Sequence, residues 1–581
     1  MTYSVRETIL MSSESSTARD DRNQTEVFAV HGADPEILAF AMAKYSRSSL
    51  SMRESLNEIS AQRAEQFLNT FYFQYGHRSI ADLAHIAFAI ERLSLLAAIV
   101  LVDETRWDGQ ERSTRYQNFL KSGWYVPDFG EDRPSADLYS QTTENLFSAY
   151  QGVSAAVLEL LRQRVEKPEA LKPEAYERTL RARAFDVARY LLPLATNTSL
   201  GQIVSARTLE TQVSRLLSHP NAEVRALGAQ LREAATSPAW NLNAEAANAF
   251  AAKLAAVERQ GSEVRGQGSG ETVSVERNPS ASLSPDVDGD SNQTVALATE
   301  ESLAEEFSAL FQREVRTAPT LVKYAQPNEY LIQSQAELAQ AATELLKNAP
   351  IAPAPLVDLV ERTESLEVEL AATLLYSASH HSYRAIRDLV VSWPAARVTE
   401  IIELGLRHRG RHDEALRAFH AGAALRFDIL MDIGGFRDMH RHRRVTQIIQ
   451  GFTSAHGYEH PGSADLPSDI DILAEAGVLD AYDSAIQSAH RAAAIIAAGS
   501  APEAAQSATY LFPLATRIRA LFKMDFAEAQ YISELRSAPA GHFSYRRIAW
   551  QMFLALQERH PTLARHIRVT DFTKPIDIFQ R

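Results

Sequence analysis

Two short polar segments of the chain carry the residue types that bind anions. The first places a carboxylate, a hydroxyl and a guanidinium close together at Glu111, Ser113 and Arg115. Arginine offers a bidentate fork to phosphate and serine a hydroxyl donor, so the set suits an anion with an attached polar ring. A solvated polar turn with a surface ion pair is the plain alternative, and the spacing alone does not exclude it.

The second segment packs three arginines and two histidines into residues 440–444. Like charges this close repel one another unless an anion lies among them. A basic surface patch is the alternative interpretation. A metal site is disfavoured, because arginines beside a divalent cation are unfavourable, and we expect no bound metal.

An internal repeat indicates how these segments are organised. The nine residues ARYLLPLAT at 188–196 recur as ATYLFPLAT at 508–516 with seven identities, and KYSRSSLSMR at 44–53 resembles LYSASHHSYR at 375–384. Two matches in the same order at similar spacing indicate a tandem duplication. We therefore expect a disordered tail at 1–28, related domains at 29–258 and 301–581, and a flexible Gly- and Ser-rich linker at 259–300.

The local patterning predicts an α+β fold with more helix than strand. Apolar residues recur at three- and four-residue spacing in 64–73, 81–90, 222–235 and 319–346, which favours helices. The segments 83–104 and 424–436 contain β-branched and aromatic residues and are compatible with strands. Within these two segments the sequence does not decide between helix and strand.

The composition limits both the chemistry and the partners. The 581-residue chain has no cysteine, which excludes a thiolate nucleophile, thiolate metal sites and structural disulfides. Its net charge of −14 argues against a nucleic acid or an anionic membrane as partner, but is compatible with a local basic pocket for a small anion. We find no apolar leader and no run of 18 apolar residues, so we expect a soluble cytoplasmic protein.

Taken together, these residues resemble the flavin-dependent thymidylate synthases, also called the alternative thymidylate synthases. That family carries a Gly-His segment, an Arg-His-Arg motif, a Glu-x-Ser-x-Arg-Tyr motif, an arginine before Leu-Pro, and a later arginine that handles the uracil base. The resemblance covers most of both halves. It implies two fused domains of this family, each with helices packed on a mixed or antiparallel sheet, so that the chain is a pseudo-dimer.

Each half lacks the motifs that the other half keeps. The surviving residues form two sets, which are Glu111, Ser113, Arg115 and Arg189 in the first half and Arg441, His442, Arg443 and Arg536 in the second. The replaced positions are Asp103, Glu104 and Thr105 in the first half and Ile449, Gly451, Thr453 and Thr509 in the second. In the family, one subunit supplies the first set to a shared site and its neighbour supplies the second. Random loss of motif residues is not expected to leave one complete set in each half, so the resemblance implies one composite site per chain.

The resemblance implies a methyl-transferring enzyme that converts dUMP to dTMP without a cysteine nucleophile. FAD reduced by NADPH would supply the hydride and methylenetetrahydrofolate the carbon, while the protein positions and polarises the reactants. Arg536 would stabilise negative charge on the uracil base. The implied dUMP-binding residues are Glu111, Ser113, Arg115, Arg189 and Arg441. The implied FAD-binding residues are Arg441, His442, Arg443, Glu111, His77, Ser79 and His412.

Some family positions are altered, which keeps other interpretations open. Asp438 stands where the family usually has a nucleotide-binding glutamine, and a carboxylate near a phosphate is unfavourable unless it pairs with Arg437. One alternative is a catalytically impaired nucleotide- or flavin-binding protein with a regulatory or structural role. Others are a different flavin- and folate-dependent transfer on a related uridine nucleotide, and a nucleic-acid module, which the acidic charge argues against. The family tetramer implies a homodimer of two-domain chains.

Overall fold

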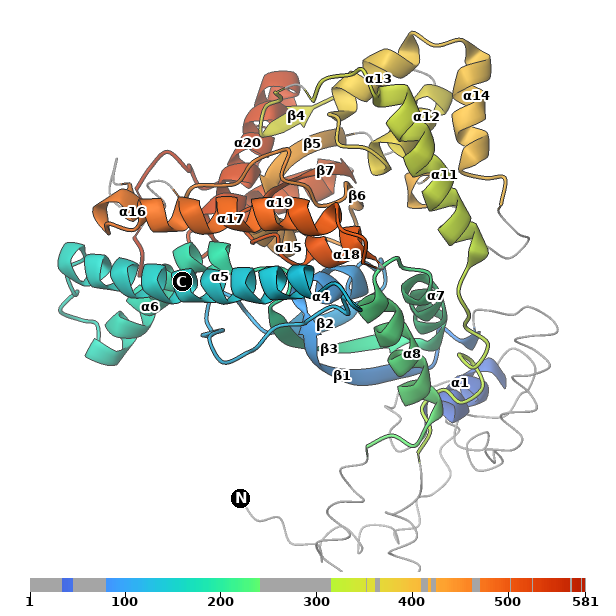
Figure 1. Cartoon of the computed structure of the whole chain (residues 1–581), viewed down its shortest axis with the longest axis horizontal. Helices are drawn as coiled ribbons and strands as arrows, with labels where there is room; N and C mark the ends of the chain where they lie inside the picture. Colours follow the sequence, from blue (N-terminus) through green and yellow to red (C-terminus); the bar gives the residue numbers. More distant parts are fainter. Residues whose placement is uncertain are drawn as a thin grey trace, which may run out of the picture.

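The computed structural model describes residues 34–44, 80–240, 315–351, 353–360, 366–408, 416–419, 425–461, 471–501, 503–524, 526–564, 567–575 and 577–579. The expected tail at 1–28 and the expected linker at 259–300 lie outside these residues. The helical pattern at 64–73 and all but the first residue of the repeat at 44–53 also lie outside them. Figure 1 labels helices and strands of the described residues.

The first half is built on an antiparallel sheet of three strands in the order β1-β3-β2. Its strands are β1 (His85–Ser94), β2 (Asp108–Glu111) and β3 (Asn197–Ser205). The segment 83–104, for which the sequence did not decide between helix and strand, is therefore a strand from His85 to Ser94, although 81–90 also carries helical spacing. Ile86 and Ile90 are buried while His85 and Ala89 are exposed, which is the two-residue alternation of a strand.

The second half repeats this arrangement. Its antiparallel sheet has the order β4-β5-β7-β6, with strands β4 (Val357–Leu359), β5 (Leu425–Asp432), β6 (Thr446–Ile449) and β7 (Arg517–Met524). The order β5-β7-β6 matches β1-β3-β2. The equivalent strands β1 and β5 each run directly into a seven-residue helix, α4 (Leu95–Leu101) or α15 (Ile433–Met439). The candidate strands at 83–104 and 424–436 are thus each a strand followed by a helix.

The two short helices are capped in equivalent ways. Ser94 Oγ accepts a bond from Ala97 N at 2.9 Å, and Asp432 Oδ1 accepts one from Gly435 N at 2.6 Å. Each satisfies a backbone donor that the first turn of a helix leaves free. The cap residues are in turn held by Glu223 in the first half and Ser544 in the second.

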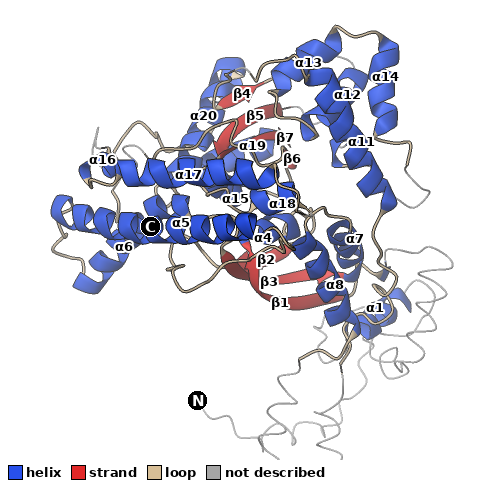
Figure 2. Cartoon of the chain, viewed as in Figure 1, coloured by secondary structure: helices blue, strands red, loops and turns tan. Residues whose placement is uncertain are grey.

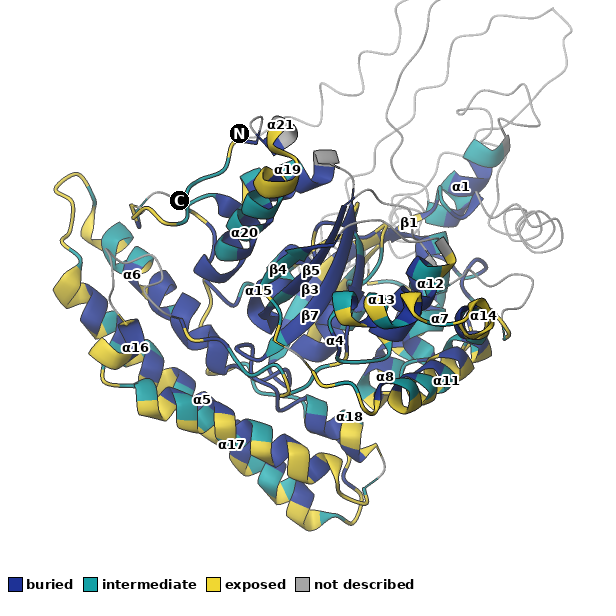
Figure 3. Cartoon of the chain, turned by 90° about the horizontal axis from the view of Figure 1, so that it is seen from above, coloured by how far each residue is buried: buried dark blue, intermediate teal, exposed yellow. Residues whose placement is uncertain are grey.

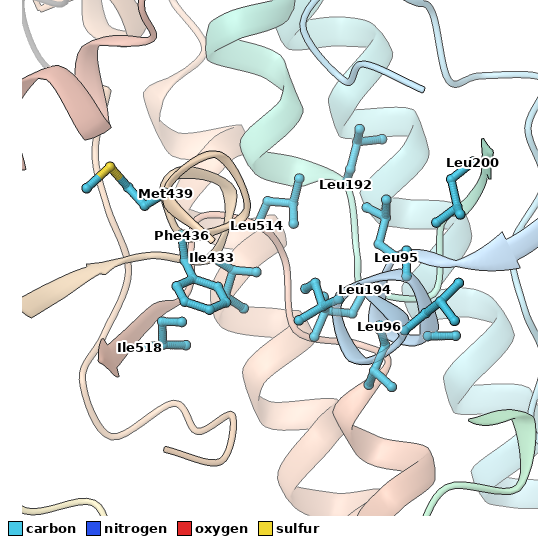
Figure 4. Packing of buried hydrophobic residues seen from close by; sticks show 14 of the residues in the cluster. Leu95, Leu96, Leu192, Leu194, Leu200, Ile433, Phe436, Met439, Leu514 and Ile518 are labelled. Atoms are coloured by element: carbon cyan, nitrogen blue, oxygen red, sulfur yellow. The ribbon is translucent and has the colours of Figure 1, made fainter. Parts of the chain in front are cut away.

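The two copies of the nine-residue repeat pair with each other across the middle of the molecule. Leu194 N donates to Phe512 O and Leu514 N donates to Leu192 O, both at 3.0 Å, and Pro193 forms a bridge with Pro513. Leucines of α4, residues of α15 and the leucines of both repeats share one hydrophobic core (Figure 4). The halves are therefore joined by backbone hydrogen bonds and a continuous core.

Helices cover the sheets and extend the pairing of the halves (Figure 2). The long helices α5 (Arg133–Arg164) and α17 (Leu479–Ala497) lie side by side, one from each half, and Figure 3 shows them along one edge, with strands of both sheets in the middle of the view. Besides α15, four helices carry residues described with the site below, which are α6 (Pro173–Ala188), α7 (Ala206–Leu217), α19 (Phe526–Ser537) and α20 (Phe543–Arg559). Helix α8 (Ala222–Thr236) carries Glu223, and α18 (Ala504–Thr509) packs against α17. The other described elements are α1 (Pro35–Lys44), α11 (Glu329–Leu346), α12 (Leu366–Ser377), α13 (Tyr383–Val391), α14 (Ala395–Leu404), α16 (Ile472–Glu475), α21 (Pro561–Ala564) and the 3-10 turns η3 (Arg189–Leu191) and η4 (Arg417–Phe419).

Two helical predictions can be compared with these bounds. The pattern at 222–235 is confirmed by α8. The pattern at 319–346 is helical only from Glu329, because Pro327 interrupts it and Asn328 caps α11 by accepting a bond from Leu331 N. Among the described residues, no helix is long and apolar enough to span a membrane.

Gly109 in β2 lies where the structure leaves no room for a side chain. A Cβ there would lie 2.3 Å from Gly201 O and 2.5 Å from the ring of Trp107, and neither a backbone oxygen nor an indole ring moves cheaply. We expect Gly109→Ala to lower the free energy of unfolding by about 1–3 kcal/mol, measured by urea denaturation. Gly152→Ala is the matched control, because an added Cβ there meets nothing within 4 Å on the exposed face of α5. A helical alanine should stabilise by up to about 1 kcal/mol, and equal effects of the two changes would contradict this account.

Candidate functional site

The two polar segments singled out from the sequence meet within one chain. Glu111 is the last residue of β2, the loop after it carries Ser113 and Arg115, and α15 with the turn after it carries Arg437 to Arg443. Arg437 Nη2 donates to Glu111 Oε1, which joins the halves by an ion pair that is largely buried on both sides. Ser113 Oγ accepts a bond from the backbone of Arg115 at 3.2 Å and so shapes the loop.

Arg115 is buried and its guanidinium is well satisfied. It binds Asp186 of α6 in a bidentate manner, with Nε to Oδ1 at 2.7 Å and Nη2 to Oδ2 at 3.0 Å. Its Nη1 donates across the halves to Tyr545 Oη at 3.1 Å and to Ala540 O at 3.3 Å. Burial alone would raise the pKa of Asp186, but the charge and hydrogen bonds of Arg115 outweigh it and hold that pKa well below its usual range.

Asp438, in the last turn of α15, lies between arginines of both halves. Arg189 Nη1 is 3.3 Å from Asp438 Oδ2, and Arg441 Nη2 donates to Asp438 Oδ1. Burial raises the pKa of Asp438, but the charges of nearby arginines outweigh it and keep that pKa well below its usual range. These arginines are, in order of effect, Arg189, Arg441, Arg115 and Arg536. Members of both sets of surviving residues therefore act on one carboxylate.

Arg437, the residue whose pairing would make Asp438 compatible with a phosphate, is not its partner. The partners of Asp438 are Arg189 and Arg441, while Arg437 pairs with Glu111. Arg189 is 2% exposed, and its Nε and Nη2 have no hydrogen-bond partner among the described residues. Nη2 of Arg189 lies against Gly434 of α15, where a Cβ would approach it to 3.4 Å. Arg189 thus has two buried donors without partners among the described residues, beside the backbone of α15.

Arg536 of α19 is held by a histidine and an aromatic ring. Its Nε donates to His442 Nε2 at 2.7 Å, and its guanidinium carbon lies 5.5 Å from the centre of the Tyr545 ring. Burial lowers the pKa of His442, and the charges of Arg536, Arg441 and Arg443 lower it further, to about 3. His442 is therefore a neutral acceptor at neutral pH, and Arg536 keeps its charge beside it.

His442 gives the folded protein a defined dependence on pH. The ordinary histidine pKa is about 6.5 and that of folded His442 is about 3, so the unfolded chain binds more protons between these values. The contribution of His442 is complete above about pH 6.5 and falls as the pH drops, by up to about 1.4 kcal/mol per pH unit. We expect the free energy of unfolding, measured in urea from pH 7 to pH 4.5, to fall more steeply in the unaltered protein than in His442→Gln. Parallel pH profiles would refute a neutral buried His442.

Arg443 lies on the aromatic side of the site. Its guanidinium carbon is 4.4 Å from the centre of the Trp107 ring, and Trp107 is fixed by donating to Gln202 of β3 at 2.7 Å. Its Nε is buried without a hydrogen-bond partner among the described residues. Burial lowers the pKa of Arg443 below its ordinary value. The Nε–H group of Arg443 is therefore a buried donor next to the face of the Trp107 ring.

The second possible site, at the residues of the first half that replace Arg-His-Arg, is filled by ion pairs within the protein. Glu104 accepts from Nε and Nη2 of Arg215 at 3.0 and 2.8 Å, and Asp103 accepts from Arg417. Glu104 takes the place of His442, and Arg215 of α7 lies one position before the residue that corresponds to Arg536 of α19, so a charged pair stands near the place of the Arg536–His442 contact. The acidic side chains there neutralise the local arginines and leave a poor place for an anion.

The sequence-based candidates divide into two groups in the structure. Glu111, Ser113, Arg115, Arg189, Arg441, His442, Arg443 and Arg536 lie together as described. His77, Ser79 and His412 lie outside the described residues. Sequence reasoning missed Asp186, Tyr545 and Trp107, which hold the arginines. Trp107 and Asp186 each stand two residues before a motif, but Asp186 and Tyr545 reach Arg115 across 71 and 430 residues of chain, which no local pattern shows. Within the described ranges, no three acidic or histidine side chains form a group suited to a metal ion.

Comparison with known proteins identifies a family match. A family model described as thymidylate synthase complementing protein matches residues 28–238 and 358–562. The first range contains β1-β3-β2 and the second contains β5-β7-β6, so the two matches fit a tandem duplication. The expected α+β fold of two related domains is confirmed.

Relatives share the full double length of the chain. A UPF0159 protein of Chlamydia pneumoniae is 25% identical over 94% of this chain and 92% of its own, and one of Chlamydia muridarum is 26% identical over 93% and 91%. A UPF0159 protein of Thermoplasma acidophilum is 24% identical over 91% and 94%.

Two solved structures are similar to part of the chain. One is the UMP/dUMP methylase PolB of Streptomyces cacaoi bound with 5-Br dUMP, at 18% identity and a TM-score of 0.26, over 34% of this chain and 84% of that chain. The other is the flavin-dependent thymidylate synthase ThyX of Helicobacter pylori complexed with FAD and dUMP, at 18% identity and a TM-score of 0.21, over 35% and 89%.

Proposed function

Because the chain belongs to the thymidylate synthase complementing protein family, we propose that it is a flavin-dependent thymidylate synthase. It converts dUMP to dTMP, with methylenetetrahydrofolate as the carbon donor and FAD reduced by NADPH as the hydride source. The proposal includes domains at 29–258 and 301–581, a cytoplasmic setting and a homodimer that corresponds to the family tetramer. The chain has no cysteine to act as a nucleophile, which fits this reaction.

One observation carries the proposal. Arg189 of the first half and Arg441 of the second both bind Asp438, and Arg115 and Arg536 lie close enough to shift its pKa. These are the arginines that survive in complementary halves, and the fold brings them to one place. Arginines gather in this way only where negative charge compensates them, either from the protein or from a ligand.

The described residues fit a phosphorylated ligand and a flat anionic cofactor. Arg189 has two buried donors without partners, and Arg437 and Arg443 each have a buried Nε without one. A buried donor without a partner is costly, so such groups favour a ligand that supplies an acceptor. For FAD, the donor set is Arg441 and Arg443 beside the Trp107 ring. When bound, FAD supplies the redox chemistry of the reaction.

Each side chain has a task that follows from its contacts. Arg189 and Arg441 bind the nucleotide phosphate, and Arg115 adds charge and a donor to that phosphate when it exchanges one of its present partners. Glu111 and Ser113 orient the nucleotide, and Glu111 also keeps Arg437 in place. Arg536 stabilises negative charge on the uracil base, because its donors are preorganised by His442 and Tyr545.

The test combines a spectrum with product analysis. The purified protein should show flavin absorbance and form dTMP from dUMP with FAD, NADPH and methylenetetrahydrofolate. Arg441→Ala should abolish dTMP formation, whereas Arg491→Ala, at an exposed position of α17, should not. Nucleotide and flavin binding without dTMP would replace this proposal with the catalytically impaired binding protein. Formation of another methylated uridine nucleotide instead of dTMP would change the substrate.

A further inference from the structure

Asp438 places a negative charge at the point where the arginines of the two halves meet. We propose that Asp438 is an internal anion that occupies the phosphate position of the composite site, so that a nucleotide phosphate binds by taking its place. The identity of the nucleotide rests on the proposed function. The exchange of a carboxylate for a phosphate follows from the arrangement of the arginines alone.

The contacts of Asp438 are those that a bound anion would make. One carboxylate oxygen binds Arg189 of the first half at 3.3 Å, and the other accepts from Arg441 of the second half. The Asp438 side chain is only 13% exposed. Carboxylates and phosphates use the same guanidinium fork, so the two groups compete for it.

The surrounding charge keeps this carboxylate ionised. Burial disfavours the charged form, but the four nearby arginines outweigh it and lower the pKa of Asp438. The carboxylate is therefore always present as a competitor at neutral pH. It also keeps Arg189 and Arg441 close together when no ligand is bound, which reduces the repulsion between them.

The arginines can satisfy more acceptors than a carboxylate offers. Arg189 retains two buried donors without partners, and the Arg441 side chain is 53% exposed. A phosphate has three acceptor oxygens and a greater charge, so it can engage these donors where the two oxygens of Asp438 do not. A phosphate dianion and the Asp438 carboxylate repel each other at the same arginines, so the carboxylate must move aside when phosphate binds.

The exchange determines which ligands the site accepts. A nucleoside without a phosphate has nothing to compete with Asp438 for the arginines, so it leaves the carboxylate in place. The phosphate of a nucleoside monophosphate forms ion pairs with the arginines, but the ion pairs between these arginines and Asp438 must break first. The site therefore selects a phosphorylated nucleotide and binds it more weakly than an uncharged residue at 438 would allow.

The first experiment uses inorganic phosphate as the probe and does not depend on the reaction. Binding is followed by the rise in melting temperature as phosphate replaces chloride at constant ionic strength. We expect Asp438→Asn to bind phosphate about 10- to 100-fold more tightly than the unaltered protein, the range of one to two charged hydrogen bonds. Asp480→Asn, at an exposed position of α17, makes the same charge change and should behave like the unaltered protein. An equal phosphate response in Asp438→Asn and the unaltered protein overturns the inference.

Two further variants secure the interpretation. Asp438→Gln should show the same gain, so a folding defect of one variant does not decide the outcome. Adding Arg441→Ala to Asp438→Asn should remove most of the gain, which assigns the phosphate to this arginine. A gain that survives the loss of Arg441 contradicts the proposed position.

A parallel titration with dUMP separates this inference from the proposed function. Tighter binding of both phosphate and dUMP to Asp438→Asn supports both. Tighter binding of phosphate without binding of dUMP supports the internal anion and overturns the nucleotide. Normal dTMP formation with no change in phosphate or dUMP affinity supports the function and overturns the internal anion.

Discussion

Asp186→Ala is expected to lower the free energy of unfolding by about 3–5 kcal/mol, measured by urea or thermal denaturation. The change removes the partner of two nitrogens of Arg115, and both side chains of this pair are almost completely buried. The loss leaves an uncompensated guanidinium in the interior between the halves, where water does not replace the carboxylate. Because Arg115 also binds Tyr545 and Ala540, the effect should appear as cooperative unfolding of both halves.

The same helix offers a matched control. Glu177 of α6 pairs with Arg162 at a largely exposed position, so Glu177→Ala should cost less than about 1 kcal/mol. Replacing the buried pair by apolar residues, Arg115→Met with Asp186→Leu, should recover part of the lost stability. A loss for Asp186→Ala no greater than that for Glu177→Ala would mean that Arg115 and Asp186 do not hold the halves together.

Arg536→Ala is expected to lower kcat for dTMP formation by about 100- to 1,000-fold, the effect of removing one preorganised donor from a developing negative charge. Arg536 is fixed by His442 and lies over Tyr545, so its loss should not disturb the arginines that bind Asp438. The dissociation constant for dUMP should therefore change by much less than kcat. Steady-state kinetics together with a dUMP titration separate the two quantities.

Two further variants serve as controls for this prediction. Arg491→Ala removes an exposed arginine of α17 and should leave kcat unchanged. Arg536→Lys keeps the positive charge and should restore part of the activity, although an ammonium group does not reproduce the planar fork. A kcat for Arg536→Ala within about threefold of the unaltered protein would remove Arg536 from the chemistry.

The sequence predicted the duplication and the arginines, and the structure explains what it left out. The repeat at 188–196 and 508–516 was visible as identity, but its two copies also pair with each other, which no local pattern predicts. Asp186 and Tyr545 stand in no motif, because their importance comes from reaching Arg115 across the fold. Buried partners of a functional arginine are set by tertiary packing, and a single sequence does not show them.

Strand β1 lies in a segment where the local pattern alone did not decide between helix and strand. The apolar residues of 81–90 match helical spacing, yet the segment pairs with β3 from His85 onward. Ile86 and Ile90 satisfy both periods, since they lie four residues apart on a helix and on one face of a strand. The pairing with β3 decided between them, because it satisfies the backbone while both isoleucines remain buried.

Asp438 departs from the family motif, and the contacts that explain this departure are formed only in the fold. In the sequence it was an acidic residue where the family usually has a glutamine, unfavourable near a phosphate unless it paired with Arg437. In the structure Arg437 is engaged by Glu111, and Asp438 bridges Arg189 and Arg441. In the sequence, the carboxylate of Asp438 argued against phosphate binding. In the structure, the arginines of the proposed site gather around this carboxylate.

The central claim is that one site is assembled within a single chain from complementary halves. The most direct measurement combines two inactive variants, Arg189→Ala in the first half and Arg441→Ala in the second, co-expressed with different tags and purified through both. If the site lies within one chain, each chain of the mixed assembly is defective, and dTMP formation should stay as low as in either variant alone. Recovery of a substantial fraction of the activity would show that the halves of different chains share the site, and would contradict this account.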